Sequence, residues 1–105
     1  MNSHDVFLIY IPFNDGSGGE TRSAIAIRLR SREAFLILPI TSKYENKSET
    51  IKKRYYEIKD LDSAGLKRKS WVDTGNRFEL KSNFNPYRVI GHFSEEDIIG
   101  LSKMI

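Results

Sequence analysis

Three apolar runs near the N-terminus constrain the fold of this chain more than any other feature. Residues 6–12 (VFLIYIP), 24–29 (AIAIRL) and 34–40 (AFLILPI) are rich in β-branched, aliphatic and aromatic side chains, so each predicts a strand. A break with three glycines at residues 14–19 and a short polar break at residues 30–33 separate them. Such breaks favour tight turns. We therefore expect three consecutive antiparallel strands.

Shorter elements are expected in the second half of the chain. Residues 41–51 are polar and predict a loop, and residues 60–65 (DLDSAG) predict a single turn that ends at a glycine. Further strands are expected at residues 53–58, 70–74, 77–80 and 87–93.

The clearest helix signal lies close to the C-terminus. Ser94 can cap a helix, and Asp97 follows three residues later as in a capping box. Packing of this helix against the strands is the default expectation, and a share in a dimer seam is the alternative. The expected apolar face of this helix comprises Ile98, Leu101 and Ile105, widened by Ile99 and Met104.

The order of the elements predicts the fold class. Many short strands followed by one terminal helix predict a mainly β protein, folded as a small barrel.

Length and composition favour one globular domain over residues 1–105. The chain has no cysteine, which excludes disulfides, cysteine-bound zinc and a thiol nucleophile and suits the cytoplasm. The apolar runs are shorter than a membrane span, and the N-terminus lacks the basic start of a signal peptide. We therefore expect a cytoplasmic protein.

Positive charge is concentrated in the middle of the chain. The net charge is +3, and residues 43–69 contain nine Lys or Arg against five acids, with Tyr44, Tyr55 and Tyr56 between them. A basic stretch with interleaved aromatics suits a polyanion such as a nucleic acid. A solvated surface of mixed charge is an equally good interpretation.

Five short motifs follow one another in an order that resembles the PemK/MazF-like toxins. In chain order they are PFNDGSG at residues 12–18, TR at 21–22, ITSK at 40–43, AGLKRKS at 64–70 and IGHFSEEDI at 90–98. The series covers nearly the whole chain. The sequence differs from the family's usual pattern at Arg22-Ser23, at His4-Asp5 and at Asp73-Thr74-Gly75.

This resemblance implies an SH3-like barrel with a terminal helix, a homodimer and a toxin neutralised by a small antitoxin. The implied activity is metal-independent, sequence-selective cleavage of single-stranded mRNA, with no cofactor. In such a reaction the ribose 2′-OH attacks the adjacent phosphate, so DNA is not cut. One group must take the 2′ proton, another must protonate the leaving oxygen, and a cation must stabilise the added charge.

The expected catalytic residues are Arg22, Thr41 and Ser42. Arg22 follows the glycine-rich break, where a guanidinium could bind a phosphate in bidentate fashion, and the matching family residue stabilises charge or acts as an acid. Thr41 and Ser42 match the family's Thr-Ser pair, and their hydroxyls could orient the 2′-OH. The alternatives are a surface Arg22 paired with Glu20, and two hydroxyls that only terminate a strand.

Further residues are expected to contact RNA or to assist the reaction. Phe13, Asn14 and Gly18 would belong to a loop over the substrate, or to a plain hairpin loop. Asp73 and Arg77 could contact phosphate, although a salt bridge within a turn is the simpler interpretation. The expected substrate-binding set is Phe13, Asn14, Gly18, Lys43, Asp73 and Arg77.

Other side chains are expected to be structural. Histidine is the side-chain type suited to proton transfer near neutrality, so His4 or His92 could act as a base, but a lone histidine is more often structural and neither has the spacing of a metal site. Trp71 and Phe78 are expected in the core. Two other functions remain open: a non-catalytic barrel that binds nucleic acid or protein, and a toxin of the same general fold that poisons gyrase.

Overall fold

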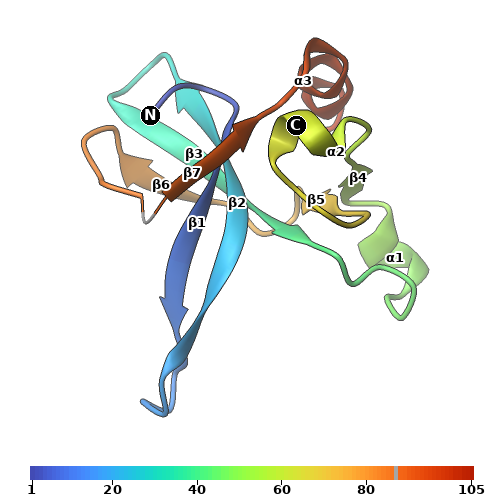
Figure 1. Ribbon diagram of the computed structural model, residues 1–105, viewed down its shortest axis with the longest axis horizontal. Coiled ribbons are helices and arrows are strands. Elements are labelled where there is room, and N and C mark those ends of the chain that lie inside the picture. The colour runs from blue at the N-terminus through green and yellow to red at the C-terminus, as the bar shows by residue number, and fades with distance from the viewer. Residues whose placement is uncertain (87) are drawn as a thin grey trace.

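The computed structural model describes residues 1–86 and 88–105, and they form a mainly β protein with a few short helices (Figure 1). In this part of the chain, seven strands build one antiparallel sheet with the order β4-β5-β3-β2-β1-β7, and β6 also pairs with β3. Tyr87, the first residue of the expected last strand, lies outside the described residues. The elements are β1 Asp5–Pro12, β2 Gly19–Leu29, β3 Ala34–Thr41, α1 Glu49–Lys52, β4 Tyr55–Glu57, α2 Leu61–Ala64, β5 Trp71–Asp73, β6 Phe78–Lys81, β7 Arg88–His92 and α3 Glu95–Ser102.

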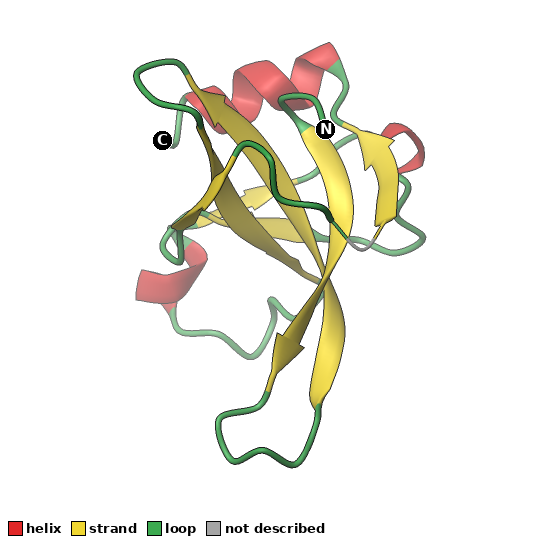
Figure 2. Cartoon of the chain, turned by 90° about the vertical axis from the view of Figure 1, so that its left-hand side faces the viewer, coloured by secondary structure: helices red, strands yellow, loops and turns green. Residues whose placement is uncertain are grey.

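The three N-terminal strands confirm the expectation from the apolar runs, with one difference. β2 begins at Gly19, five residues before the expected start. Residues 19–23 pair with residues 8–12 of β1, and this part of the hairpin projects from the body of the protein as a two-stranded arm (Figures 1 and 2). On β2 this part of the strand is polar, with Glu20, Thr21 and Arg22 exposed, so no apolar pattern marked it.

β3 pairs with β2 along most of its length and then leaves it. The pairing of the two strands ends at Ala24 and Pro39. Beyond this point Ile40 and Thr41 pair with β5 instead, whereas the first half of β3 pairs with β6. Proline has no N–H to donate to a ladder, which suits a point where pairing stops. The polar end of β2 and the end of β3 therefore diverge.

The sheet buries apolar side chains on both faces. One cluster lies between the sheet, including its strands β4 and β5, and the helices α2 and α3, and it includes Val6, Ile25, Leu38, Phe93 and Leu101. The second lies on the opposite face of β1 to β3 and comprises Phe7, Ala24, Ala26, Phe35 and Ile37. Phe84 covers the second cluster, with its ring centroid 5.6 Å from that of Phe7 and 6.4 Å from that of Phe35. Alternating residues of the central strands thus support two separate cores.

α3 begins where the sequence predicts. The Ser94 hydroxyl caps it by accepting the Asp97 N–H at 3.3 Å. Asp97, however, points its carboxylate into the protein, where it accepts hydrogen bonds from the Tyr56 hydroxyl and from the Lys59 and Asp60 N–H groups. The expected reciprocal capping box is therefore only half formed.

The apolar face of α3 is narrower than expected. Leu101 is buried, and Ile98 and Met104 pack on the first cluster, which confirms docking against the sheet. Ile99 lies within the helix but is 49% exposed and does not join the first cluster, and Ile105, which is 44% exposed, lies beyond the end of the helix at Ser102.

The remaining helices are single turns. α2 begins after Asp60 and ends at Gly65, which has a φ of 73°, and this confirms the turn expected at residues 60–65. α1 was not expected, because residues 41–51 were predicted to be a loop; Ser48 caps it by accepting the Ile51 N–H. No helix in the described ranges is long and apolar enough to cross a membrane.

Candidate functional site

A surface hollow lies where β2 and β3 diverge, and we call it the fork hollow. It has a volume of about 200 Å³ and is lined by Glu20, Thr21, Arg22 and Ser23 on one side and by Ile40, Thr41, Ser42 and Lys43 on the other. The expected catalytic residues Arg22, Thr41 and Ser42 therefore line one hollow, together with Lys43. Arg22 and Thr41 each lie two residues beyond the last pair of the two strands, Ala24 with Pro39, so the same register would set them opposite one another. The strands separate at this point, and the residues beyond the last pair therefore line the hollow that opens between them.

A second hollow continues from the fork hollow on the Pro39 face of β3, and we call it the Asp73 hollow. Its volume is about 350 Å³. It shares Glu20, Arg22, Thr41 and Lys43 with the fork hollow. The residues that it adds are Pro39, Lys47, Tyr55, Asp73 and Asn76. Arg22 thus stands between two connected depressions that contain three cations, two carboxylates and a phenol.

The Arg22 side chain has an acidic neighbour on its own strand. Its Nε lies 3.5 Å from Glu20 Oε1, and the two side chains are 42% and 53% exposed. An exposed pair of this kind contributes little to stability, at most about 1 kcal/mol. Its interest is chemical, because it sets a carboxylate beside a guanidinium in the fork hollow. The surface pairing of Arg22 with Glu20 that was considered as an alternative is therefore present, within the hollow itself.

Tyr55 and Asp73 face the same hollow from the paired strands β4 and β5. They are direct partners in the antiparallel register. Burial, followed by the nearby charge of Asp73, raises the pKa of the Tyr55 hydroxyl, while Arg54 and Arg22 act in the opposite direction. A phenol is protonated at neutral pH, and an upward shift of the pKa leaves it so, which means that Tyr55 can donate a hydrogen bond to a ligand in the hollow.

Asp73 and Arg77 do not form the salt bridge that was considered for their turn. Asp73 is 5% exposed and accepts hydrogen bonds from Gly75 N–H at 2.9 Å and from Asn76 Nδ2 at 2.7 Å. The Arg77 guanidinium instead donates to the Thr74 carbonyl at 3.0 Å. Arg77 is not among the residues that line the two hollows, whereas Asp73 lines one of them.

The expected loop residues lie at the tip of the arm, away from the hollows. The Phe13 N–H donates to the Gly18 carbonyl at 2.7 Å, which closes the turn, and Phe13 is 48% exposed. The last pair of the arm is Pro12 with Gly19, three positions beyond the pair of Ile9 with Arg22. At about 3.3 Å per residue the tip begins roughly 10 Å from Arg22. Phe13, Asn14 and Gly18 are therefore not brought together with the expected catalytic residues.

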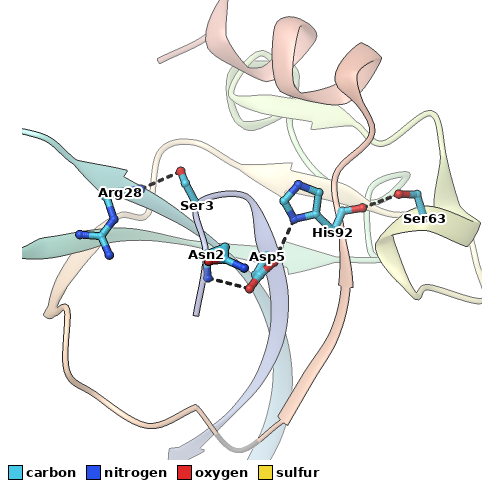
Figure 3. A network of polar contacts seen from close by, with 6 residues as sticks. All are labelled: Asn2, Ser3, Asp5, Arg28, Ser63 and His92. Carbon is cyan, nitrogen blue, oxygen red and sulfur yellow. Dashed lines mark hydrogen bonds and ion pairs between the residues drawn. The ribbon is translucent and has the colours of Figure 1, made fainter.

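Both histidines lie near the opposite end of β1, where Figure 3 shows His92 beside Asp5. His92 Nδ1 lies 2.9 Å from Asp5 Oδ1, and the Ser63 hydroxyl donates to the His92 carbonyl. His4 precedes β1 with a φ of 70°, and burial, followed by the charge of His92, lowers its pKa. Neither histidine lines the fork hollow or the Asp73 hollow. This cluster ties the N-terminus to β7 and α2.

The two aromatic residues that were expected in the core differ from one another. Trp71 is 6% exposed and stacks on Tyr44, with ring centroids 4.5 Å apart, so it is a core residue. Phe78 is 41% exposed on β6, and its expected burial is wrong. It lies on the short edge strand, which covers only the first half of β3.

Several residues of the two hollows were not expected from the sequence: Glu20, Lys47, Tyr55 and Asn76. Glu20 belongs to the part of β2 that carries no apolar pattern, and the other three depend on how β4 and β5 dock beside β3.

No group of three His, Asp or Glu side chains that could hold a metal ion occurs among the residues described. Neither protein-family models nor curated proteins give a match to this chain.

Proposed function

We propose that this protein is a metal-independent endoribonuclease that cleaves single-stranded RNA in the fork hollow. The observation that supports this proposal is the shared position of Arg22, Thr41 and Ser42 around one depression. A guanidinium binds phosphate oxygens with two parallel hydrogen bonds, and neighbouring hydroxyls can fix the ribose. The cations Lys43 and Lys47 extend the attraction for a polyanion into the Asp73 hollow.

In the proposed reaction the ribose 2′ oxygen forms a bond to the adjacent phosphorus, and the bond from phosphorus to the 5′ oxygen breaks. The products are a 2′,3′-cyclic phosphate and a free 5′ hydroxyl. Arg22 stabilises the charge that builds up on the phosphate oxygens, which is the largest single contribution in sites of this type. Thr41 and Ser42 hold the 2′-OH in line with the bond that breaks.

Two residues of the hollows supply the proton transfers in this proposal. Glu20, whose carboxylate lies beside Arg22, accepts the proton of the 2′-OH. Tyr55, whose raised pKa keeps it protonated, donates a proton to the leaving 5′ oxygen. Asp73 supports Tyr55, and its own oxygens are already engaged by Gly75 and Asn76.

The resemblance to the PemK/MazF-like toxins supports the same function and extends it. On this proposal the antiparallel sheet is an SH3-like barrel, and the protein is a cytoplasmic toxin that acts as a homodimer on mRNA until a cognate antitoxin covers the groove. The positions of Arg22, Thr41 and Ser42 agree with the family motifs. In many members of the family a basic residue and a carboxylate, two apart, follow the Ala-Gly-Leu segment, and the matching stretch here is Asp73-Thr74-Gly75. Glu20 would supply the carboxylate that this stretch does not provide.

The test is cleavage of a long single-stranded RNA by purified protein in the presence of EDTA. Arg22→Ala is expected to lower kcat/KM by about a thousandfold, the scale seen when one charge-stabilising donor is removed. Arg30→Ala is the matched control, because Arg30 is an exposed arginine in the turn at the far end of β2. Product ends should carry 2′,3′-cyclic phosphate, and single-stranded DNA should stay intact. Cleavage that needs magnesium, or that survives Arg22→Ala, contradicts the proposal.

A non-catalytic nucleic-acid-binding protein is the second candidate. The contacts of the two carboxylates in the hollows favour it, because Asp73 is engaged by Gly75 and Asn76, and Glu20 is paired with Arg22. In that case wild-type protein would bind RNA with a strong dependence on salt and leave the RNA uncut. Binding to gyrase with intact RNA would identify a third function, a gyrase poison.

A further inference from the structure

A third hollow lies on the other face of β3, and we call it the Leu66 hollow. Its volume is about 320 Å³. The residues that line it are Ser23, Ile40, Thr41, Ser42, Gly65, Leu66, Lys67, Arg68, Ser70 and Ile90. Ile40, Leu66 and Ile90 belong to the first apolar cluster, so this hollow opens on the face that α2 and α3 cover. The Asp73 hollow, which contains Pro39, opens on the opposite face of the same strand.

The Leu66 hollow is continuous with the fork hollow. Both are lined by Ser23, Ile40, Thr41 and Ser42. Thr41 lines all three hollows, because it stands at the end of β3 where β2 has turned away. The fork hollow, which Arg22 and Thr41 line, therefore adjoins a hollow on each face of β3.

The chemistry of the Leu66 hollow differs from that of the other two. Its floor is apolar, formed by Ile40, Leu66 and Ile90, and serine and threonine hydroxyls lie around the floor. Lys67 and Arg68 are exposed and supply positive charge at one side. An apolar floor with a few hydroxyls suits the flat face and polar edge of a nucleobase, and the cations suit its phosphate.

The shape of this hollow depends on a close backbone approach. Gly65 has a φ of 73°, and a Cβ on it would overlap the Ile90 carbonyl. A Cβ on Gly91 would likewise overlap the backbone of Ala64. The end of α2 therefore lies directly against β7, which sets Leu66 and Ile90 side by side as the floor. The floor is fixed by rigid backbone rather than by a loop tip.

We propose that the Leu66 hollow is a nucleobase subsite that selects the base of the nucleotide next to the scissile phosphate. Leu66 and Ile90 receive the face of the base, and Lys67 and Arg68 hold the phosphate beyond it. This inference rests on the proposed nuclease function for the position of the scissile bond. The base of the RNA is then selected in the Leu66 hollow, on the opposite face of β3 from the Asp73 hollow with Lys43, Lys47 and Asp73.

The test separates base selection from cleavage. The probe is a random pool of single-stranded 2′-deoxy oligonucleotides, which cannot be cut by 2′-OH attack. Wild-type protein is expected to enrich one base at one position. Leu66→Ala should reduce that enrichment by roughly tenfold, the order of discrimination that an apolar pocket provides. The double variant Lys67→Ala/Arg68→Ala should weaken binding of all sequences and lower the salt slope by about one unit, while it keeps the preference.

The matched control is Lys81→Ala/Arg30→Ala, which removes two exposed cations far from the hollow in sequence and should keep both affinity and preference. A photoreactive halogenated analogue of the selected base, placed at the selected position, should crosslink to the segment 65–70, and this readout does not require the Leu66 variant to fold. Equal base preference in wild type and folded Leu66→Ala, or crosslinks confined to the arm, would overturn the subsite. RNA that binds with the expected preference but is never cut would overturn the nuclease and leave the subsite standing.

Discussion

The buried carboxylate of Asp97 offers a sharp test of how the C-terminal helix is held. Asp97 is 0% exposed and accepts hydrogen bonds from the Tyr56 hydroxyl at 2.6 Å, Lys59 N–H at 2.8 Å and Asp60 N–H at 2.9 Å. Burial, followed by the hydrogen bond to Asp97, raises the pKa of Tyr56, so the phenol remains a donor throughout the neutral range. One side chain therefore joins α3, β4 and the start of α2.

Asp97→Ala should remove both acceptor oxygens and so leave these three donors without their partner. A buried donor left unpaired costs about 1–3 kcal/mol, and relief from burying the charge offsets part of the sum. We therefore expect a loss of about 4 kcal/mol, which is a large fraction of the 5–15 kcal/mol typical of domain stability. Asp97→Asn keeps the shape and should cost about 2–3 kcal/mol, because its amide N–H₂ would face the Asp60 N–H.

Equilibrium urea unfolding measures the effect. With a slope of about 2 kcal/mol per molar urea, Asp97→Ala should lower the midpoint by about 2 M. The matched control is Tyr56→Phe, which removes one donor and leaves two backbone bonds to the carboxylate, at a cost of about 1 kcal/mol. If Asp97→Ala shifts the midpoint no further than Tyr56→Phe, the backbone hydrogen bonds do not contribute and the reasoning is wrong.

Three other predictions follow from features described above. His4→Asn should reduce the loss of stability that occurs between about pH 7.5 and pH 5. Burial lowers the pKa of folded His4 below its usual 6.5, so the stabilisation by His4 is complete above that pH and is lost as the pH falls. An unchanged profile of urea midpoint against pH would contradict this. Gly65→Ala should cost more than about 3 kcal/mol in thermal unfolding, against about 1 kcal/mol for Gly16→Ala, because both have a φ near 75° but only the Cβ at Gly65 overlaps backbone; equal costs would refute this. Glu20→Gln should lower kcat/KM for RNA by at least about a hundredfold with an unchanged circular dichroism spectrum, and a wild-type rate would remove Glu20 from the mechanism.

The sequence predicted the strands and caps that have a strong local cause. Continuous apolar runs located β1 and β3 to within a residue, and Ser94 marked the start of α3. The early part of β2 was missed because residues 19–23 are stabilised by pairing with β1 rather than by burial. Local sequence patterns indicate which segments are buried and where helices are capped, but they do not indicate a two-stranded hairpin that is exposed to solvent.

The candidate site shows the same division. The meeting of Arg22 with Thr41 and Ser42 was expected from the resemblance, since nothing in their spacing along the chain brings them together. Tyr55 and Lys47 were missed because their position depends on the pairing of β3 with β5 after Pro39. Non-local strand pairing is decided by the whole sheet, so single residues give no sign of it.

The projecting arm has a mechanical consequence for the site. Arg22 is held by β1 alone, because β3 has left β2 at that level, whereas Thr41 is anchored to the body through Trp71. An isolated two-stranded ribbon bends and twists more readily than a wider sheet. The spacing between guanidinium and hydroxyl is therefore governed by the coiling of the ribbon. Substitutions near the tip of the arm can therefore change the distance between Arg22 and Thr41 while every residue that lines the fork hollow stays the same.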